Sequence, residues 1–146
     1  MRVSKKSEYA VRALLEIALG RLEGREWRQI SQIAEATRIP EKFLEQILLA
    51  LKKRGLLQSR RGVIGGYALA VEPGAIRLDE VIQILDGETS GEATDPAGDI
   101  GARVFRRLLA RSEDAALEVL RGVTLAQLVE EAHQMRSSPS GMDYHI

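Results

Sequence analysis

The chain has 146 residues, of which 45% are hydrophobic and 29% are charged, a balance typical of one soluble globular domain with an added element. It contains no cysteine and only two histidines, so disulfides, thiolate metal sites and a protein-built zinc or copper site are not expected. No apolar run reaches the roughly 18 residues of a membrane span, and no apolar signal core follows the basic N-terminus, so we expect a cytoplasmic protein.

The net charge is zero, but the charges are unevenly distributed. Residues 1–70 carry 14 Lys/Arg and 7 Asp/Glu, whereas residues 71–146 carry 7 Lys/Arg and 14 Asp/Glu. A basic half favours a polyanionic partner, most often a nucleic acid, and the acidic half would face away from that partner. Chance clustering of the charges is the alternative that this pattern alone leaves open.

Three helices are predicted in the first third of the chain. Ser4 is a suitable N-cap for the first, whose apolar positions keep a helical period until Gly20 ends it. A polar loop leads to a short second helix that begins near Gln29. Residues 37–40 form a tight turn into a third helix, which Gly55 ends. The apolar stripe of the third helix is Leu44, Ile47, Leu48 and Leu51.

A β-hairpin and three more helices follow. Residues 56–61 and 67–70 have the composition of two short strands, and the glycine-rich segment between them predicts a tight hairpin tip. A fourth helix over residues 78–85 ends near Gly87, and residues 87–98 read as an exposed acidic loop. A long fifth helix is predicted from residue 99 to residue 121.

The last predicted helix begins at a capping box, in which Thr124 and Gln127 are correctly spaced, and runs to about Met135. Residues 137–141 are rich in Ser, Pro and Gly and predict a flexible linker. We therefore divide the chain into residues 1–86, residues 87–136 and a flexible C-terminal tail (137–146).

Three helices followed by a hairpin predict a mainly α fold, in which residues 1–86 form a winged helix-turn-helix DNA-binding domain. Residues 87–136 would then supply an effector loop and the dimerisation helices, the first of them the long C-terminal dimerisation helix. The third helix would enter the major groove of DNA. Its outward face carries Lys42, Gln46, Leu49 and Lys53, with Glu45 on the flank. An amide can read adenine and a carboxylate can accept from the cytosine amino group. The alternative is that these are ordinary solvated residues.

The hairpin carries Arg60 and Arg61 just before its glycine tip. Glycines permit close backbone approach and positive φ angles. An arginine held beside such a tip can enter the minor groove, where the negative potential is strongest over narrow A·T-rich steps. Lysines near the N-terminus and at the end of the third helix would contact phosphates.

These segments resemble the Rrf-two family of bacterial winged-helix regulators, the IscR, NsrR and CymR type. The resemblance lies in residues 1–10, in the Phe-Leu-Glu-Gln segment at 43–46 and in the Arg-Gly and Gly-Gly-Tyr elements within 55–69, and it covers nearly the whole chain. It implies a winged-helix domain, a dimer and palindromic operators, and it places Arg61 at the minor groove. The residues expected at DNA are Arg2, Ser4, Lys5, Lys42, Phe43, Glu45, Gln46, Lys53, Arg60, Arg61, Gly65 and Gly66.

One departure from the family pattern concerns the iron–sulfur cluster. Cluster-binding members place three cysteines in the loop that corresponds to residues 87–98, and this chain has none. Glu8 occupies the place where some relatives supply an acidic ligand, but a carboxylate without thiolates cannot hold such a cluster. We interpret Glu8 as a solvated helix residue. The chain resembles the cysteine-free, CymR-like branch, and we expect no cofactor and no metal.

The long helix predicts a homodimer. Its 23 residues from 99 to 121 would span roughly 34 Å, more than a small domain can cover. Small and apolar residues recur along it with alternating spacings of four and three, which suits a helix–helix seam. An intramolecular core helix is the alternative. The residues expected at the dimer seam are Val104, Phe105, Leu108, Ser112, Ala115 and Val119.

The signal that the protein senses is left open between a small-molecule pocket and a docking surface for another protein. The chain ends in Asp143-Tyr144-His145-Ile146 after the flexible linker, which resembles the C-terminal tail of serine acetyltransferase that inserts into cysteine synthase. Backbone donors can capture such a terminal carboxylate. This resemblance makes cysteine synthase a candidate partner, docked by Tyr144 and Ile146. The alternative is a tail that packs on its own dimer.

An enzyme is not expected, since the chain has no cysteine nucleophile and neither histidine lies in a recognisable acid–base arrangement. The sequence predicts a DNA-binding transcription regulator, a repressor in the form of a homodimer on palindromic operators, controlled by cysteine synthase or by a sulfur or amino-acid metabolite. The alternative is a protein-interaction module without DNA binding. Such a module has no need for paired arginines beside a glycine tip.

Overall fold

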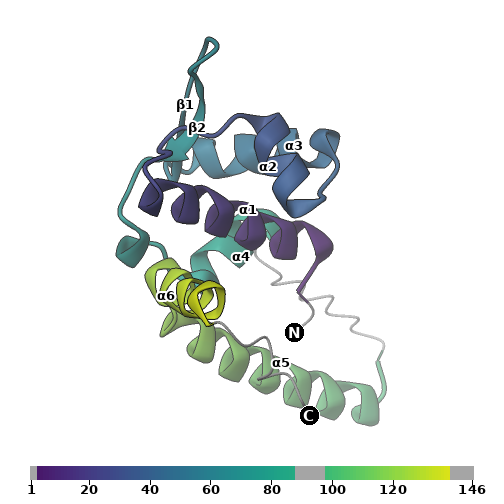
Figure 1. Cartoon of the computed structure of the whole chain (residues 1–146). Coiled ribbons are helices and arrows are strands. Elements are labelled where there is room, and N and C mark those ends of the chain that lie inside the picture. The colour runs from purple at the N-terminus through teal and green to yellow at the C-terminus, as the bar shows by residue number, and fades with distance from the viewer. Residues whose placement is uncertain (1–2, 88–97, 139–146) are drawn as a thin grey trace.

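The computed structural model describes residues 3–87 and 98–138, and within them the fold is mainly α-helical with one two-stranded hairpin. Figure 1 shows α1 crossing the middle of the molecule, with the hairpin, α2 and α3 on one side and α4, α5 and α6 on the other. The elements are α1 (Lys5–Leu22), α2 (Ile30–Thr37), α3 (Glu41–Lys53), β1 (Leu57–Arg60), β2 (Gly66–Leu69), the 3-10 turn η1 (Pro73–Ala75), α4 (Leu78–Asp86), α5 (Ile100–Arg121) and α6 (Leu125–Ser137).

The hydrophobic core forms around α1. Its buried face packs against α2, α3, α4 and α6, because small residues at Ala10 and Ala13 let neighbouring helices approach and Leu14 and Ile17 fill the space between them. The predicted N-cap is confirmed, since the Ser4 hydroxyl accepts a hydrogen bond from the Ser7 backbone N–H. Leu125 and Val129 of α6 belong to the same core. The predicted domain division near residue 86 stays a prediction.

The expectation that Gly20 ends the first helix is wrong. The helix continues to Leu22, and Gly20 lies on its buried face. A Cβ at Gly20 would lie 2.7 Å from Nη1 of Arg28, so this glycine makes room for a packed arginine. The chain reverses two residues beyond the helix, at Gly24, whose φ of +82° favours glycine.

The helix-turn-helix is present as predicted. Arg38 takes the left-handed conformation after α2, with φ of 59°, and Pro40 precedes α3 in an extended conformation. Thr37 joins the end of α2 to this turn, because its hydroxyl donates to the Ile33 carbonyl at 2.6 Å and accepts from the Ile39 N–H at 3.4 Å. The predicted apolar stripe of α3 is buried in full, and Gly55 follows the helix with φ of +81°.

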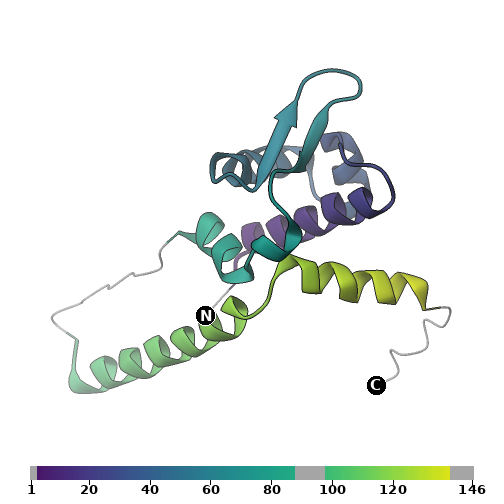
Figure 2. The same ribbon diagram turned by 90° about the vertical axis from the view of Figure 1, so that its left-hand side faces the viewer.

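The hairpin is antiparallel, and it pairs Leu57 with Leu69 at its base and Arg60 with Gly66 near its tip. It forms the wing of the fold, and Figures 1 and 2 show it projecting from the domain on the side of α2 and α3. The structure also contains a contact that we did not predict: the backbone of Arg28 forms an isolated antiparallel β-bridge with Tyr67 of β2. This bridge ties the wing to the segment that precedes α2.

The long helix α5 begins as predicted, since the Asp99 side chain accepts from the Ala102 backbone N–H at 2.7 Å. None of its residues is buried, and Figure 2 shows most of its length extending away from the rest of the fold. The alternative of an intramolecular core helix is therefore not what the structure shows. The predicted capping box of α6 is also present, but α6 continues to Ser137, so the first residue of the expected linker is helical.

Candidate DNA-binding surface

The exposed face of α3 carries the side chains expected to read DNA. Lys42, Glu45, Gln46 and Lys53 are all exposed, on the face opposite the buried leucines. Leu49, also exposed, lies among them and supplies an apolar contact of the size that a thymine methyl group needs. The helix presents polar, basic and apolar groups outward while its other face is held by the core.

Phe43 is half exposed and packs edge-on against Tyr9 of α1, with the ring centroids 6.4 Å apart. The Arg12 guanidinium lies over the same Tyr9 ring, 5.7 Å from its centroid, and donates to the Thr37 carbonyl. Phe43 thus links the start of α3 to α1. Its exposed half is free to contact DNA, but its visible role is to position the helix.

The two wing arginines differ in a way that the sequence did not reveal. The Arg60 guanidinium lies 4.2 Å from the centroid of the Trp27 ring and donates to the Ile64 carbonyl at 2.8 Å, so it is held within the protein. Arg61 is exposed, and among the described residues it has no hydrogen bond or ion pair. Gly62, next to it, has φ of +110°. Of the two, Arg61 is the side chain available to a ligand.

The geometry of the hairpin itself requires glycine at two positions of the wing. A Cβ at Gly65 would lie 2.2 Å from the Arg60 carbonyl oxygen, and one at Gly66 would lie 2.2 Å from the Arg28 carbonyl oxygen. Gly66 also has φ of +126°. Both residues were predicted at DNA, and that prediction stays open. Their evident function is to let the tip close and let the wing approach residue 28.

The N-terminal segment contributes less free polar surface than predicted. The Ser4 hydroxyl caps α1 and also donates to the carboxylate of Asp86 at the end of α4. Lys5 is exposed and lies 3.3 Å from Glu8, which agrees with the interpretation of Glu8 as a solvated helix residue. Arg2 lies outside the described residues, as do Tyr144 and Ile146 and most of the predicted effector loop.

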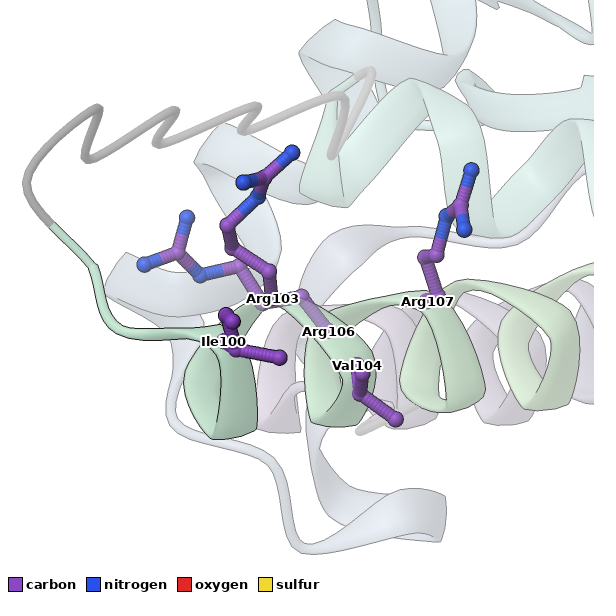
Figure 3. A pocket seen from close by; sticks show the side chains of 5 residues that line it. All are labelled: Ile100, Arg103, Val104, Arg106 and Arg107. Atoms are coloured by element: carbon purple, nitrogen blue, oxygen red, sulfur yellow. The ribbon is translucent and has the colours of Figure 1, made fainter.

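The predicted dimer seam forms an exposed row on α5, and Val104, Phe105, Leu108 and Val119 in it are large apolar side chains with more than half of their surface free. Ser112 and Ala115 are exposed on the same face. The helix also carries a cluster of arginines. Figure 3 shows Arg103 and Arg107 extending to the opposite side of α5 from Val104. The basic and apolar residues still adjoin one another, since Arg107 and Arg111 line one surface hollow together with Val104 and Leu108.

The donor set does not fit an iron–sulfur cluster. The chain contains no cysteine, and thiolates are the dominant ligands of such clusters. Residues 3–87 and 98–138 also contain no group of three or more His, Asp or Glu side chains placed to hold a metal ion. Over the same residues, no helix is both long and apolar enough to cross a membrane.

Sequence reasoning missed the segment 27–29 as part of this surface. Trp27 contacts Arg60, and Arg28 and Gln29 contact other parts of the wing. The available signal was that Trp27 is the only tryptophan of the chain and lies in an otherwise polar loop before the helix-turn-helix. Large aromatic side chains in such loops usually pack against something.

Comparison with known proteins identifies the family. Residues 3–131 match the family model described as "Rrf2: Iron-dependent Transcriptional regulator". The chain is 35% identical over 132 residues to the HTH-type transcriptional regulator CymR of Bacillus subtilis (strain 168). The aligned region covers 88% of this chain and 89% of that protein.

Two solved structures agree with this assignment. The structure of T. potens IscR superposes with a TM-score of 0.77 at 30% identity, covering 99% of this chain and 97% of that one. A structure of CymR (YrzC), described as the global cysteine regulator of B. subtilis, gives a TM-score of 0.74 at 31% identity, covering 90% of this chain and 98% of that one. The chain therefore belongs to the Rrf2 family of helix-turn-helix transcription regulators, which are not enzymes.

Proposed function

We propose that this regulator is a homodimeric repressor that places α3 of each subunit in the major groove of a palindromic operator and the wing in the adjacent minor groove. The observation that carries the proposal is that α3 and the projecting wing lie on the same side of α1 (Figure 1), and both carry exposed side chains, among them Arg61, which has no hydrogen bond or ion pair within residues 3–87 and 98–138. That geometry suits helix-in-groove docking with a minor-groove contact beside it. Repression would follow from occupation of the operator.

The homodimer is supported by α5. An exposed apolar row on a 22-residue helix with no buried residue needs a cover, and a second copy of the same helix is the most economical one. A two-fold dimer presents two recognition helices to successive half-sites, which predicts an operator with matching two-fold symmetry.

The test of DNA recognition is Arg61→Ala, measured by fluorescence anisotropy on an operator identified by sequencing the DNA bound by the protein. Loss of a base-reading contact should weaken specific binding by about 1–3 kcal/mol. Arg21→Ala is the matched control, because Arg21 is an exposed arginine that pairs with Glu72 on another part of the surface. Equal affinities for the wild type and the Arg61 variant, both folded, would contradict the minor-groove role. Failure of the wild type to bind any DNA would favour the interaction-module alternative.

We also propose that the regulator works without an iron–sulfur cluster, because its sequence has no thiolate to offer. Protein purified in the absence of oxygen should be colourless. A visible charge-transfer band accompanied by stoichiometric iron and sulfide would show that this proposal is wrong.

For the signal, we propose control by cysteine synthase or by a sulfur or amino-acid metabolite. The support is the similarity to CymR, which is described in its solved structure as the global cysteine regulator of B. subtilis, and the tail that resembles the one of serine acetyltransferase. Tyr144 and Ile146 would dock, with the terminal carboxylate held by backbone donors. The competing idea is a tail packed on its own dimer. Calorimetry with cysteine synthase separates the two: deletion of Ile146 should abolish heat of binding if the tail docks, and absence of heat with the intact chain would remove the docking idea.

A further inference from the structure

Three consecutive residues between α1 and α2 each hold a different part of the wing. The Trp27 ring lies under the Arg60 guanidinium of β1. The Arg28 backbone donates to the Tyr67 carbonyl at 2.9 Å and accepts from the Tyr67 N–H at 2.8 Å. The Gln29 side-chain amide donates to the Val63 carbonyl, at the hairpin tip, at 2.5 Å. We refer to residues 27–29 as the wing strap.

The wing strap is anchored to α1 by the side chain of Arg28, which is only 4% exposed. Its Nη1 lies 3.3 Å from Glu16 Oε1, and it also donates to the Glu16 backbone carbonyl at 3.4 Å. Gly20 provides the space for this guanidinium. A buried arginine that lost its carboxylate would be costly, so the strap cannot leave α1 without a large penalty.

The wing strap also belongs to the helix-turn-helix. Gln29 is the N-cap residue of α2, and its backbone N–H donates to Gln32 Oε1 at 2.9 Å while its carbonyl accepts from the Ile33 N–H. A shift of the strap would therefore shift the start of α2. The wing and the recognition unit are fixed to one another through three residues.

The wing needs this support because it is small. Each of its strands has four residues, and an isolated two-stranded hairpin of that length is marginally stable in water. Val63 and Ile64 at its tip are 90% and 78% exposed, so the tip packs against little. The base of the hairpin is held in the core by Leu57 and Leu69, and the strap adds contacts further toward the tip, at Arg60 and Val63.

We propose that the wing strap positions Arg61 for the minor groove, so that Trp27, Arg28 and Gln29 determine operator specificity from beneath the wing. This inference rests on the proposed DNA-binding function. Base-reading side chains must be held to about 0.5 Å to be effective, and Arg61 has no hydrogen bond or ion pair to described residues that could orient it. Its orientation is inherited from the hairpin backbone, which the strap fixes.

A double-mutant cycle tests the coupling. The penalty of Arg61→Ala on operator affinity is measured in the wild type and in the Trp27→Ala background. If the strap positions Arg61, the fold-loss caused by Arg61→Ala should shrink by at least about three-fold when Trp27 is absent. Trp27→Phe, which keeps an aromatic face for Arg60, should retain the full penalty. Additive penalties in the Trp27→Ala background would overturn the proposal.

A second measurement needs no DNA, and it covers the case in which Trp27→Ala fails to fold. Trp27 is the only tryptophan, so quenching of its emission by acrylamide reports how well the wing covers it. Gly66→Ala would place a Cβ 2.2 Å from the Arg28 carbonyl oxygen and push the wing off the strap, so quenching should increase. Ser59→Ala, an exposed position on the same hairpin, should leave it unchanged.

These two measurements fail in different ways. Equal quenching in the wild type and in a folded Gly66→Ala variant would show that the strap does not hold the wing, whatever the protein binds. Increased quenching in that variant, combined with no DNA binding by the wild type, would support the strap contacts and contradict the proposed function instead.

Discussion

The winged domain and α5 use similar sequence patterns in opposite ways. In α3 the apolar stripe from Leu44 to Leu51 is almost completely buried against α1. In α5 an apolar row of comparable strength, which includes Phe105 and Leu108, lies on the surface. Both helices are amphipathic, and the pattern indicates only that a partner surface is needed. The structure shows where that surface lies for α3, which packs on α1 of the same chain, whereas most of α5 extends away from the rest of the fold (Figure 2).

The largest expected effect on stability lies in the winged domain. Leu48→Ala should lower the free energy of unfolding by about 2–5 kcal/mol, because a large buried side chain would leave a cavity. Leu49→Ala, one residue further along α3 and about half exposed, should change stability by roughly 0.5 kcal/mol or less. Urea unfolding followed by circular dichroism measures both, and similar losses would mean that the core is not organised around this stripe.

A charge in the α5 seam should affect assembly and leave the winged domain folded. Leu108→Asp would bury a carboxylate in the proposed interface, which should raise the dimer dissociation constant by about 100-fold or more. Ala110→Asp is a matched control, since Ala110 is exposed and lies nearly opposite Leu108 on the helix. Sedimentation measures both variants. A dimer of unchanged stability in the Leu108 variant would refute the proposed seam.

The smallest expected effect lies at the junction of the two regions. Thr124 caps α6, and its hydroxyl accepts from the Gln127 N–H while the Gln127 side chain accepts from the Thr124 N–H. Thr124→Ala should cost about 0.5–2 kcal/mol of unfolding free energy. Thr124→Ser keeps the hydroxyl and should recover most of the loss. Thermal unfolding compares the two, and equal melting temperatures for the alanine variant and the wild type would show that the cap does not stabilise α6.

Local signals explain why so much of the fold could be predicted. Ser4, Asp99 and Thr124 each cap a helix with their own side chains, and the two ends of such a contact are only three residues apart in the sequence. Gly20 shows the limit of local rules. A glycine at the end of an apolar run usually ends a helix, but here the space it leaves is filled by Arg28, eight residues later.

The exposed side chains of the candidate DNA surface were predicted from the sequence, but the contacts that support the wing were not. Helical periodicity placed Lys42 and Gln46 outward, and the structure confirms that they are exposed. The unequal roles of Arg60 and Arg61 could not be predicted, because they depend on where the Trp27 ring lies in three dimensions. The bond between Ser4 and Asp86, across 82 positions of sequence, is of the same kind. Contacts between segments that are far apart in the chain produce no periodic pattern in the sequence.

The exposure of α5 has a consequence for how the regulator would respond to its own abundance. A helix with no buried residue draws little stability from its own chain, so under the proposed assembly its order depends on mass action. Below the dissociation constant of the dimer, operator occupancy would fall with the square of the protein concentration, because two subunits must meet before a two-fold site is filled. The protein concentration at which operators become occupied is then set by the dimer dissociation constant, and therefore by the side chains along one face of α5.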